Sequence, residues 1–117
     1  MARVAILADD LIWQTRLVDA AKAAGAQVDR AKTARELDAA LACADALVVD
    51  LTARNYDPLA AIRRAGEVRP GIRILAVGQH DDQALRRQAF SAGAERVLAY
   101  RKLFEDGPAT LGRWLGG

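Results

Sequence analysis

Residues 43–58 read CADALVVDLTARNYDP, and an apolar run within this stretch, residues 46–49, ends on the acid Asp50. A continuous apolar run of this length between polar segments predicts a buried strand, with Asp50 at its carboxyl end. Asp57 and Pro58 then suit the start of a helix, because aspartate caps helix N-termini and proline is favoured in the first turn. The stretch therefore predicts a strand, a loop that begins with an acid, and a helix.

The same strand-then-helix unit recurs along the chain. Strands are expected over residues 3–8, 27–31, 46–50, 73–77 and 96–100. Helices are expected from residues 11, 33, 57, 81 or 82, and 106–108, with Gly25 and Gly93 ending the first and the fourth. This alternation predicts a doubly wound, flavodoxin-like (βα)5 fold, a five-stranded parallel sheet in the order 2-1-3-4-5 with helices on both faces. We expect one domain over residues 1–117.

The composition excludes several classes of protein. The 17 basic and 15 acidic residues give a net charge of +2, the basic residues are scattered, and aromatic residues make up only 5% of the chain, so nothing favours nucleic-acid binding. The lone Cys43 cannot form an internal disulfide, which favours a reducing compartment. The apolar run near the start is too short for a signal peptide, and no segment is long enough to span a membrane. We therefore expect a cytoplasmic protein.

Three acids follow the strands that flank the point where the strand order reverses. Asp9 and Asp10 come after the first strand and Asp50 ends the third. Because such sheets bind ligands at this edge, the three carboxylates are expected to meet there. Clustered carboxylates suit Mg²⁺, and a carboxylate can accept a phosphoryl group covalently. The alternative is that each acid only caps a helix and faces water.

Four segments together resemble the receiver domain of two-component response regulators, and the resemblance covers nearly the whole chain. They read ILADDLIWQTRLV, DALVVDLTARNYDPL, RPGIRILAVGQHDD and AFSAGAERVLAY. The resemblance implies that Asp9 and Asp10 hold Mg²⁺ and that Asp50 accepts the phosphoryl group. It also implies that the backbone carbonyl of Thr52 completes the metal site.

The resemblance breaks at the positions that carry the response to phosphorylation. Where the family has a threonine or serine after the fourth strand, this chain has Gly78. The lysine and proline at the end of the fifth strand are replaced by Tyr100 and Arg101, and the switch aromatic is replaced by Val97. Losing a charged partner for a phosphoryl dianion costs a few kcal/mol, on the order of one charge-assisted hydrogen bond. The chain is therefore predicted to be an atypical, degenerate receiver.

Three cations are candidates to replace the missing lysine. They are Arg54, Arg101 and Lys102. Lys102 has the same strand parity as Tyr100, so it points the same way if the strand continues. Alternatively, Arg54 forms a salt bridge with the acids, and the site then needs neither Mg²⁺ nor phosphate.

The leading functional hypothesis is a stand-alone receiver-like module that has no enzyme activity and binds a protein partner, either a histidine kinase or a downstream signalling protein. A second hypothesis keeps Asp50 as a working, Mg²⁺-dependent phosphoacceptor. A third is a flavodoxin-like binder of a small ligand, although ADDLIW stands where a glycine-rich phosphate loop would be. His80 is interpreted as a solvated loop residue, with a metal ligand as the alternative.

By the same resemblance, partners are expected to bind the fourth helix, the fifth strand and the fifth helix, and a homodimer through the last two helices and the fifth strand is a further hypothesis. The residues expected on this surface are Arg86, Arg87, Arg96, Tyr100, Arg101 and Phe104. Arginine and aromatic side chains are enriched at protein interfaces. The alternative is a solvated basic helix face.

Overall fold

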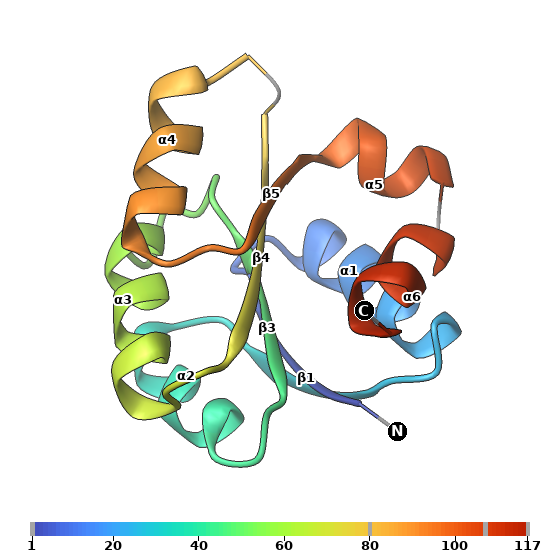
Figure 1. Cartoon of the computed structure of the whole chain (residues 1–117), viewed down its shortest axis with the longest axis horizontal. Helices are drawn as coiled ribbons and strands as arrows, with labels where there is room; N and C mark the ends of the chain where they lie inside the picture. Colours follow the sequence, from blue (N-terminus) through green and yellow to red (C-terminus); the bar gives the residue numbers. More distant parts are fainter. Residues whose placement is uncertain (1, 80, 107, 117) are drawn as a thin grey trace.

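Five parallel strands form one sheet between two layers of helices (Figure 1). The structure is a computed structural model that describes residues 2–79, 81–106 and 108–116. The strands are β1 (Arg3–Leu7), β2 (Gln27–Ala31), β3 (Ala46–Asp50), β4 (Arg73–Gly78) and β5 (Arg96–Ala99). The helices are α1 (Leu11–Ala23), α2 (Ala34–Leu41), α3 (Pro58–Val68), α4 (Gln83–Ala92), α5 (Tyr100–Asp106) and α6 (Pro108–Gly116). The order β2-β1-β3-β4-β5, with every pair parallel, confirms the predicted fold class.

Both faces of the sheet are buried, which explains why the strand sequences are continuously apolar. In β3 the side chains of Leu47 and Val49 pack against α2, α3 and α4, while those of Ala46 and Val48 pack against the layer of α1, α5 and α6. Figure 1 shows these two layers on opposite sides of the sheet. All five residues of β3 are buried, as the apolar run predicted.

The helix ends follow the signals in the sequence. Four helices begin after a side chain that accepts a hydrogen bond from the backbone of the first turn, namely Asp10, Thr33, Asp57 and Asp82. Gly25 and Gly93, just after α1 and α4, have φ angles of 91° and 130°, a region that glycine enters without steric cost. These residues therefore fix where α1 to α4 start and where α1 and α4 stop.

The C-terminal part differs from the prediction. The fifth strand ends at Ala99, so the predicted strand over residues 96–100 is one residue too long, and a helix that was not predicted, α5, precedes the last one. Tyr100 and Leu103 are buried against the α1 layer, and Phe104 packs beside them, so the apolar side of this segment has helical spacing. His80 and Gly107, which entered the sequence predictions, lie outside the described residues. Across the described part of the chain, no helix is both long and apolar enough to cross a membrane.

Candidate functional site

The three predicted acids lie at the carboxyl edge of the sheet. Strands β1 and β3 are parallel neighbours, with Leu7 opposite Val49, so the residues that follow each strand share one edge. Asp50 ends β3 and is only 1% exposed, whereas Asp9 is half-buried and Asp10 is exposed in the turn before α1. The topology therefore places the three acids at one edge of the sheet, but it buries the candidate phosphoacceptor Asp50.

One oxygen of the Asp50 carboxylate accepts several hydrogen bonds. The backbone N–H and the hydroxyl of Thr52 each donate to Oδ1 over 2.8 Å, and the hydroxyl of Tyr100 donates to the same oxygen. The other oxygen, Oδ2, is buried, and no group in the described part of the chain hydrogen-bonds to it. A buried carboxylate is thus stabilised on one side only.

Tyr100 reaches Asp50 from the first residue of α5 and is held there by a stack of rings. Its ring lies 4.1 Å from that of Trp13, measured between centroids, with the two planes 22° apart. Phe104 stacks on the same indole at 5.6 Å, and the guanidinium of Arg16 lies over it at 5.3 Å. Burial, and next the hydrogen bond to Asp50, raise the pKa of Tyr100 well above its usual value, so the phenol remains a neutral donor.

Backbone donors already engage the two acids that follow β1. Oδ2 of Asp9 accepts hydrogen bonds from the N–H groups of Arg54 and Asn55, over 2.8 and 2.7 Å. Oδ1 of Asp10 accepts from the N–H of Trp13 over 3.0 Å and caps α1. Asp9 therefore ties the loop after β3 to the end of β1, and Asp10 starts a helix. Both roles are structural.

A hard cation such as Mg²⁺ requires several free oxygen ligands around one point. Asp9, Asp10, Thr52 and Arg54 line a hollow of about 490 Å³, but Asp50 does not. Among the described residues, no three side chains of histidine, cysteine, aspartate or glutamate are grouped so that they could hold a metal ion. The three carboxylates are therefore not gathered around one point in the described part of the chain. Magnesium binding by Asp9, Asp10, Asp50 and Thr52 stays a prediction.

Comparison with known proteins identifies the fold that carries this site. No protein-family model and no curated protein matches the sequence. Solved structures match almost the whole chain. The BeF3-activated receiver domain of DrrB has a TM-score of 0.82 and 19% identity, over 99% of this chain and 95% of its own. The chain has the receiver-domain fold.

Two further structures extend the comparison. A response regulator receiver domain protein from Methanospirillum hungatei JF-1 has a TM-score of 0.81 and 19% identity, over 99% of this chain and 91% of its own. A response regulator from Burkholderia pseudomallei, solved with a phosphorylated aspartic acid, a calcium ion and citrate, has a TM-score of 0.79 and 21% identity. That match covers 99% of this chain and 71% of the other. At these identities the likeness establishes the fold.

Gly78, one of the positions where the chain departs from the receiver pattern, has a packing reason. A Cβ atom at Gly78 would lie 3.3 Å from the Cβ of Leu51, which is closer than most real contacts of this kind. Leu51 is fixed there because its N–H donates to the carbonyl of Val77 over 2.8 Å. A residue with a side chain at position 78 therefore crowds the loop that follows Asp50.

The three candidate cations, Arg54, Arg101 and Lys102, are exposed. The backbone N–H of Arg54 donates to Asp9, and among the described residues the Arg54 guanidinium forms no ion pair with the three acids. Arg101 and Lys102 are exposed on the first turn of α5. The expected parity of Lys102 with Tyr100 is wrong because the strand ends at Ala99, and residues two apart on a helix point in different directions.

The residues of the expected partner surface are divided between different parts of the receiver fold. Tyr100 is buried and Phe104 packs beside it in the α1 layer. Val97, which was predicted as a lost switch position and not as part of this surface, is buried in the layer of α3 and α4. Arg86, on α4, donates to the carbonyl of Val97 over 2.8 Å, and Arg87 lines a groove between α3 and α4. Arg96 and Arg101 are exposed on β5 and α5. A partner surface formed by α4, β5 and α5 stays a prediction.

Two buried polar residues at this edge of the receiver fold were not predicted. The hydroxyl of Tyr56 lies 2.7 Å from the carbonyl oxygen of Asp50 and 3.0 Å from that of Leu7. The amide nitrogen of Gln14 donates to the carbonyls of Ala8 and Ala31, over 3.0 and 3.2 Å. Both side chains serve carbonyl groups at the ends of strands. The one signal in the sequence is a polar residue on an otherwise apolar helix face, which applies to Gln14 alone.

Proposed function

We propose that this chain is a receiver-type module of two-component signalling that acts by binding a protein partner, with Tyr100 keeping Asp50 out of reach of phosphodonors. The receiver fold and the position of Asp50 at the end of β3 support the signalling role. The cover over Asp50 supports an output that does not depend on conventional phosphorylation-driven switching.

The observation that carries the proposal is the environment of the Asp50 carboxylate. Phosphoryl transfer requires the acceptor oxygen to approach the phosphorus in line with the leaving group. Oδ1 is surrounded by Thr52 and Tyr100, Oδ2 is buried, and the residue is 1% exposed. On this proposal, a donor reaches the carboxylate only after the Tyr100 ring leaves its place beside Trp13.

The chemistry of the covering group supports the same conclusion. In the receiver pattern, a lysine at this position would supply a positive charge to a phosphoryl dianion. A phenol supplies one hydrogen bond and no charge, and burial holds its pKa above the physiological range. Because charge-assisted hydrogen bonds are roughly twice as strong as neutral ones, Tyr100 would stabilise an aspartyl phosphate less than lysine would.

A second candidate function is a working phosphoacceptor. It is favoured by Oδ2 of Asp50, to which no described group hydrogen-bonds and which would be the reacting atom. The similar structure from Burkholderia pseudomallei that carries a phosphorylated aspartic acid also favours it. In that case Tyr100 moves during the reaction. The two candidates differ in one measurable property, the reactivity of Asp50 while Tyr100 is present.

Intact-mass spectrometry after incubation with Mg²⁺ and acetyl phosphate separates them. We expect the unmodified chain to gain no phosphoryl group and the Tyr100→Ala variant to gain one, which the Asp50→Ala/Tyr100→Ala double variant lacks. Tyr100→Phe, which keeps the ring and removes the hydroxyl, tells whether the ring alone blocks the donor.

Two results would count against the proposal. Phosphorylation of the unmodified chain at Asp50, as fast as in Tyr100→Ala, would favour the working phosphoacceptor. If neither protein is modified while circular dichroism shows both to be folded, the role assigned to Tyr100 is wrong.

A further inference from the structure

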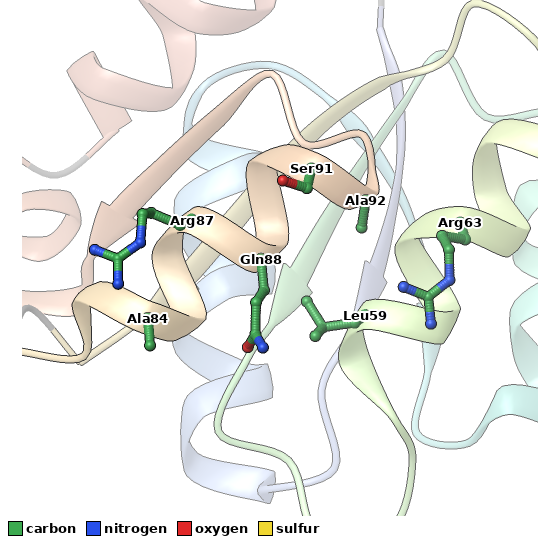
Figure 2. A pocket seen from close by; sticks show the side chains of 7 residues that line it. All are labelled: Leu59, Arg63, Ala84, Arg87, Gln88, Ser91 and Ala92. Carbon is green, nitrogen blue, oxygen red and sulfur yellow. The ribbon is translucent and has the colours of Figure 1, made fainter.

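A groove runs between α3 and α4, on the face of the sheet opposite α1 and α5. Its volume is about 470 Å³, and its lining includes Leu59, Arg63, Ala84, Arg87, Gln88 and Ser91. Figure 2 shows Leu59 and Gln88 facing each other from the two helices, with Arg63 extending from α3 beside them. The groove thus has the apolar side chain of Leu59 and the amide of Gln88 at its centre, and one arginine on each helix.

The four arginines of these two helices differ in what they contact. Arg64 pairs with Asp38 at 2.9 Å, and Arg86 donates to the carbonyl of Val97 and lies over the ring of Phe90. Arg63 and Arg87 line the groove, and within the described part of the chain neither forms an ion pair or a hydrogen bond through its side chain. Arg64 and Arg86 thus make contacts within the fold, whereas the side chains of Arg63 and Arg87 are open to a ligand in the groove.

The two helices that form this groove carry an excess of positive charge. Helices α3 and α4 carry four arginines and one glutamate, Glu67, which gives +3, whereas the whole chain carries +2. The acids at the start of the two helices, Asp57 and Asp82, are bound to backbone N–H groups. The charged residues that line the groove are therefore all basic, which favours an acidic occupant.

We infer that the α3–α4 groove binds an acidic segment of a partner protein, with its carboxylates on Arg63 and Arg87 and an apolar side chain against Leu59. Nucleic acid is disfavoured because the described side chains around the groove include no aromatic ring on which bases could stack. Arginine suits carboxylates because its guanidinium donates two parallel hydrogen bonds. The inference is independent of whether Asp50 is phosphorylated.

Titration of the ¹⁵N-labelled chain with short peptides, followed by NMR, tests the inference. We expect a peptide of alternating glutamate and leucine to shift the amides of α3 and α4 saturably, with a dissociation constant below about 1 mM. A peptide of alternating glutamine and leucine is expected to bind at least about tenfold more weakly. Higher salt is expected to weaken the first interaction, because ions screen exposed charges.

Charge variants separate the groove from the overall charge. The variant Arg63→Glu/Arg87→Glu is expected to stop binding the acidic peptide and to bind a peptide of alternating lysine and leucine. The variant Arg63→Gln/Arg87→Gln is expected to stop binding the acidic peptide without gaining affinity for the basic one. Lys22→Glu/Arg30→Glu changes the net charge equally at exposed positions away from the groove, and it is expected to bind like the unmodified chain. The inference is wrong if this control loses binding equally, if the shifts lie outside α3 and α4, or if no saturable binding occurs. A single-stranded DNA oligonucleotide that shifts the same amides more strongly would also overturn it.

Discussion

The hydroxyl of Tyr100 donates a hydrogen bond to the carboxylate of Asp50, so the first residue of α5 covers the carboxyl end of β3. The two residues are 50 positions apart in the sequence and come from different layers of the fold. Trp13 stacks on the Tyr100 ring and Thr52 lies 3.0 Å from its hydroxyl, so neighbours from two other segments hold the tyrosine. Substitutions at Tyr100 are therefore expected to change both the free energy of unfolding and the reactivity of the Asp50 carboxylate.

Removing the Tyr100 hydroxyl tests the strength of this hydrogen bond. Tyr100→Phe keeps the ring on Trp13 and leaves the Asp50 carboxylate with the two Thr52 donors. We expect the free energy of unfolding, measured with urea, to fall by about 1.5–3 kcal/mol, the usual value for a hydrogen bond to a charged group. A loss below about 0.5 kcal/mol would mean that the hydroxyl contributes nothing to Asp50.

Alkaline titration tests the burial of both tyrosines in the sequence, Tyr56 and Tyr100. Burial raises both pKa values above the ordinary 10.0, helped at Tyr56 by the charge of Asp50 and at Tyr100 by the hydrogen bond to it. The unfolded chain therefore loses these protons first, so their contribution to stability is complete below pH 10.0 and is lost as the pH rises beyond it.

We expect tyrosinate absorbance to appear only together with the loss of far-ultraviolet circular dichroism. Tyr56→Phe and Tyr100→Phe are each expected to make the alkaline decline of stability less steep, because each variant removes one of the protons involved. Ionisation near pH 10 in a chain that is still folded would show that a tyrosine is open to solvent.

Substitution of the neighbouring acids Asp9 and Asp10 by alanine is predicted to have different effects. Asp9→Ala removes the acceptor of the Arg54 and Asn55 N–H groups, so these two amides are expected to exchange faster with solvent in NMR. Asp10→Ala removes the α1 cap and is expected to cost about 1 kcal/mol while leaving those two amides protected. Equal exchange of the two amides in both variants would show that Asp9 does not hold the loop.

Adding a methyl group at Gly78 tests the crowding against Leu51. We expect Gly78→Ala to lower the free energy of unfolding by about 1–3 kcal/mol, because the neighbour must give way. The matched control is Gly66→Ala on α3, where nothing lies within 4 Å and alanine favours the helix by about 1 kcal/mol. In urea unfolding, the free energy of unfolding is therefore expected to fall for Gly78→Ala and to rise for Gly66→Ala. A more stable Gly78→Ala variant would exclude crowding as the reason for glycine at position 78.

Much of the fold was predictable because the signals are local. The apolar run of β3, the caps Asp10 and Asp57, and the glycines after α1 and α4 each act within a few residues. Helix α5 was missed although Tyr100, Leu103 and Phe104 have helical spacing, because Tyr100 also continues the apolar run of β5. A short segment that suits both structures is decided by packing, here against α1.

The site was predictable only in part, for a physical reason. The position of Asp50 follows from the strand. The side chain that donates to its carboxylate, Tyr100, comes from α5, and no local pattern in the sequence predicts this contact. Tyr56 serves carbonyls of two strands, which become neighbours only in the folded chain. The same holds for Leu51 and Gly78, whose close approach belongs to the tertiary structure.

The loop between β3 and α3 leaves little freedom for change. Each of the four residues 54–57 makes a hydrogen bond, Arg54 and Asn55 to Asp9, Tyr56 to strand carbonyls, and Asp57 to the first turn of α3. Helix α3 begins at the next residue and carries one wall of the groove. In evolutionary terms, an insertion or deletion in this loop alters the acid edge and the groove at once. We expect homologues to conserve its length more strictly than its side chains.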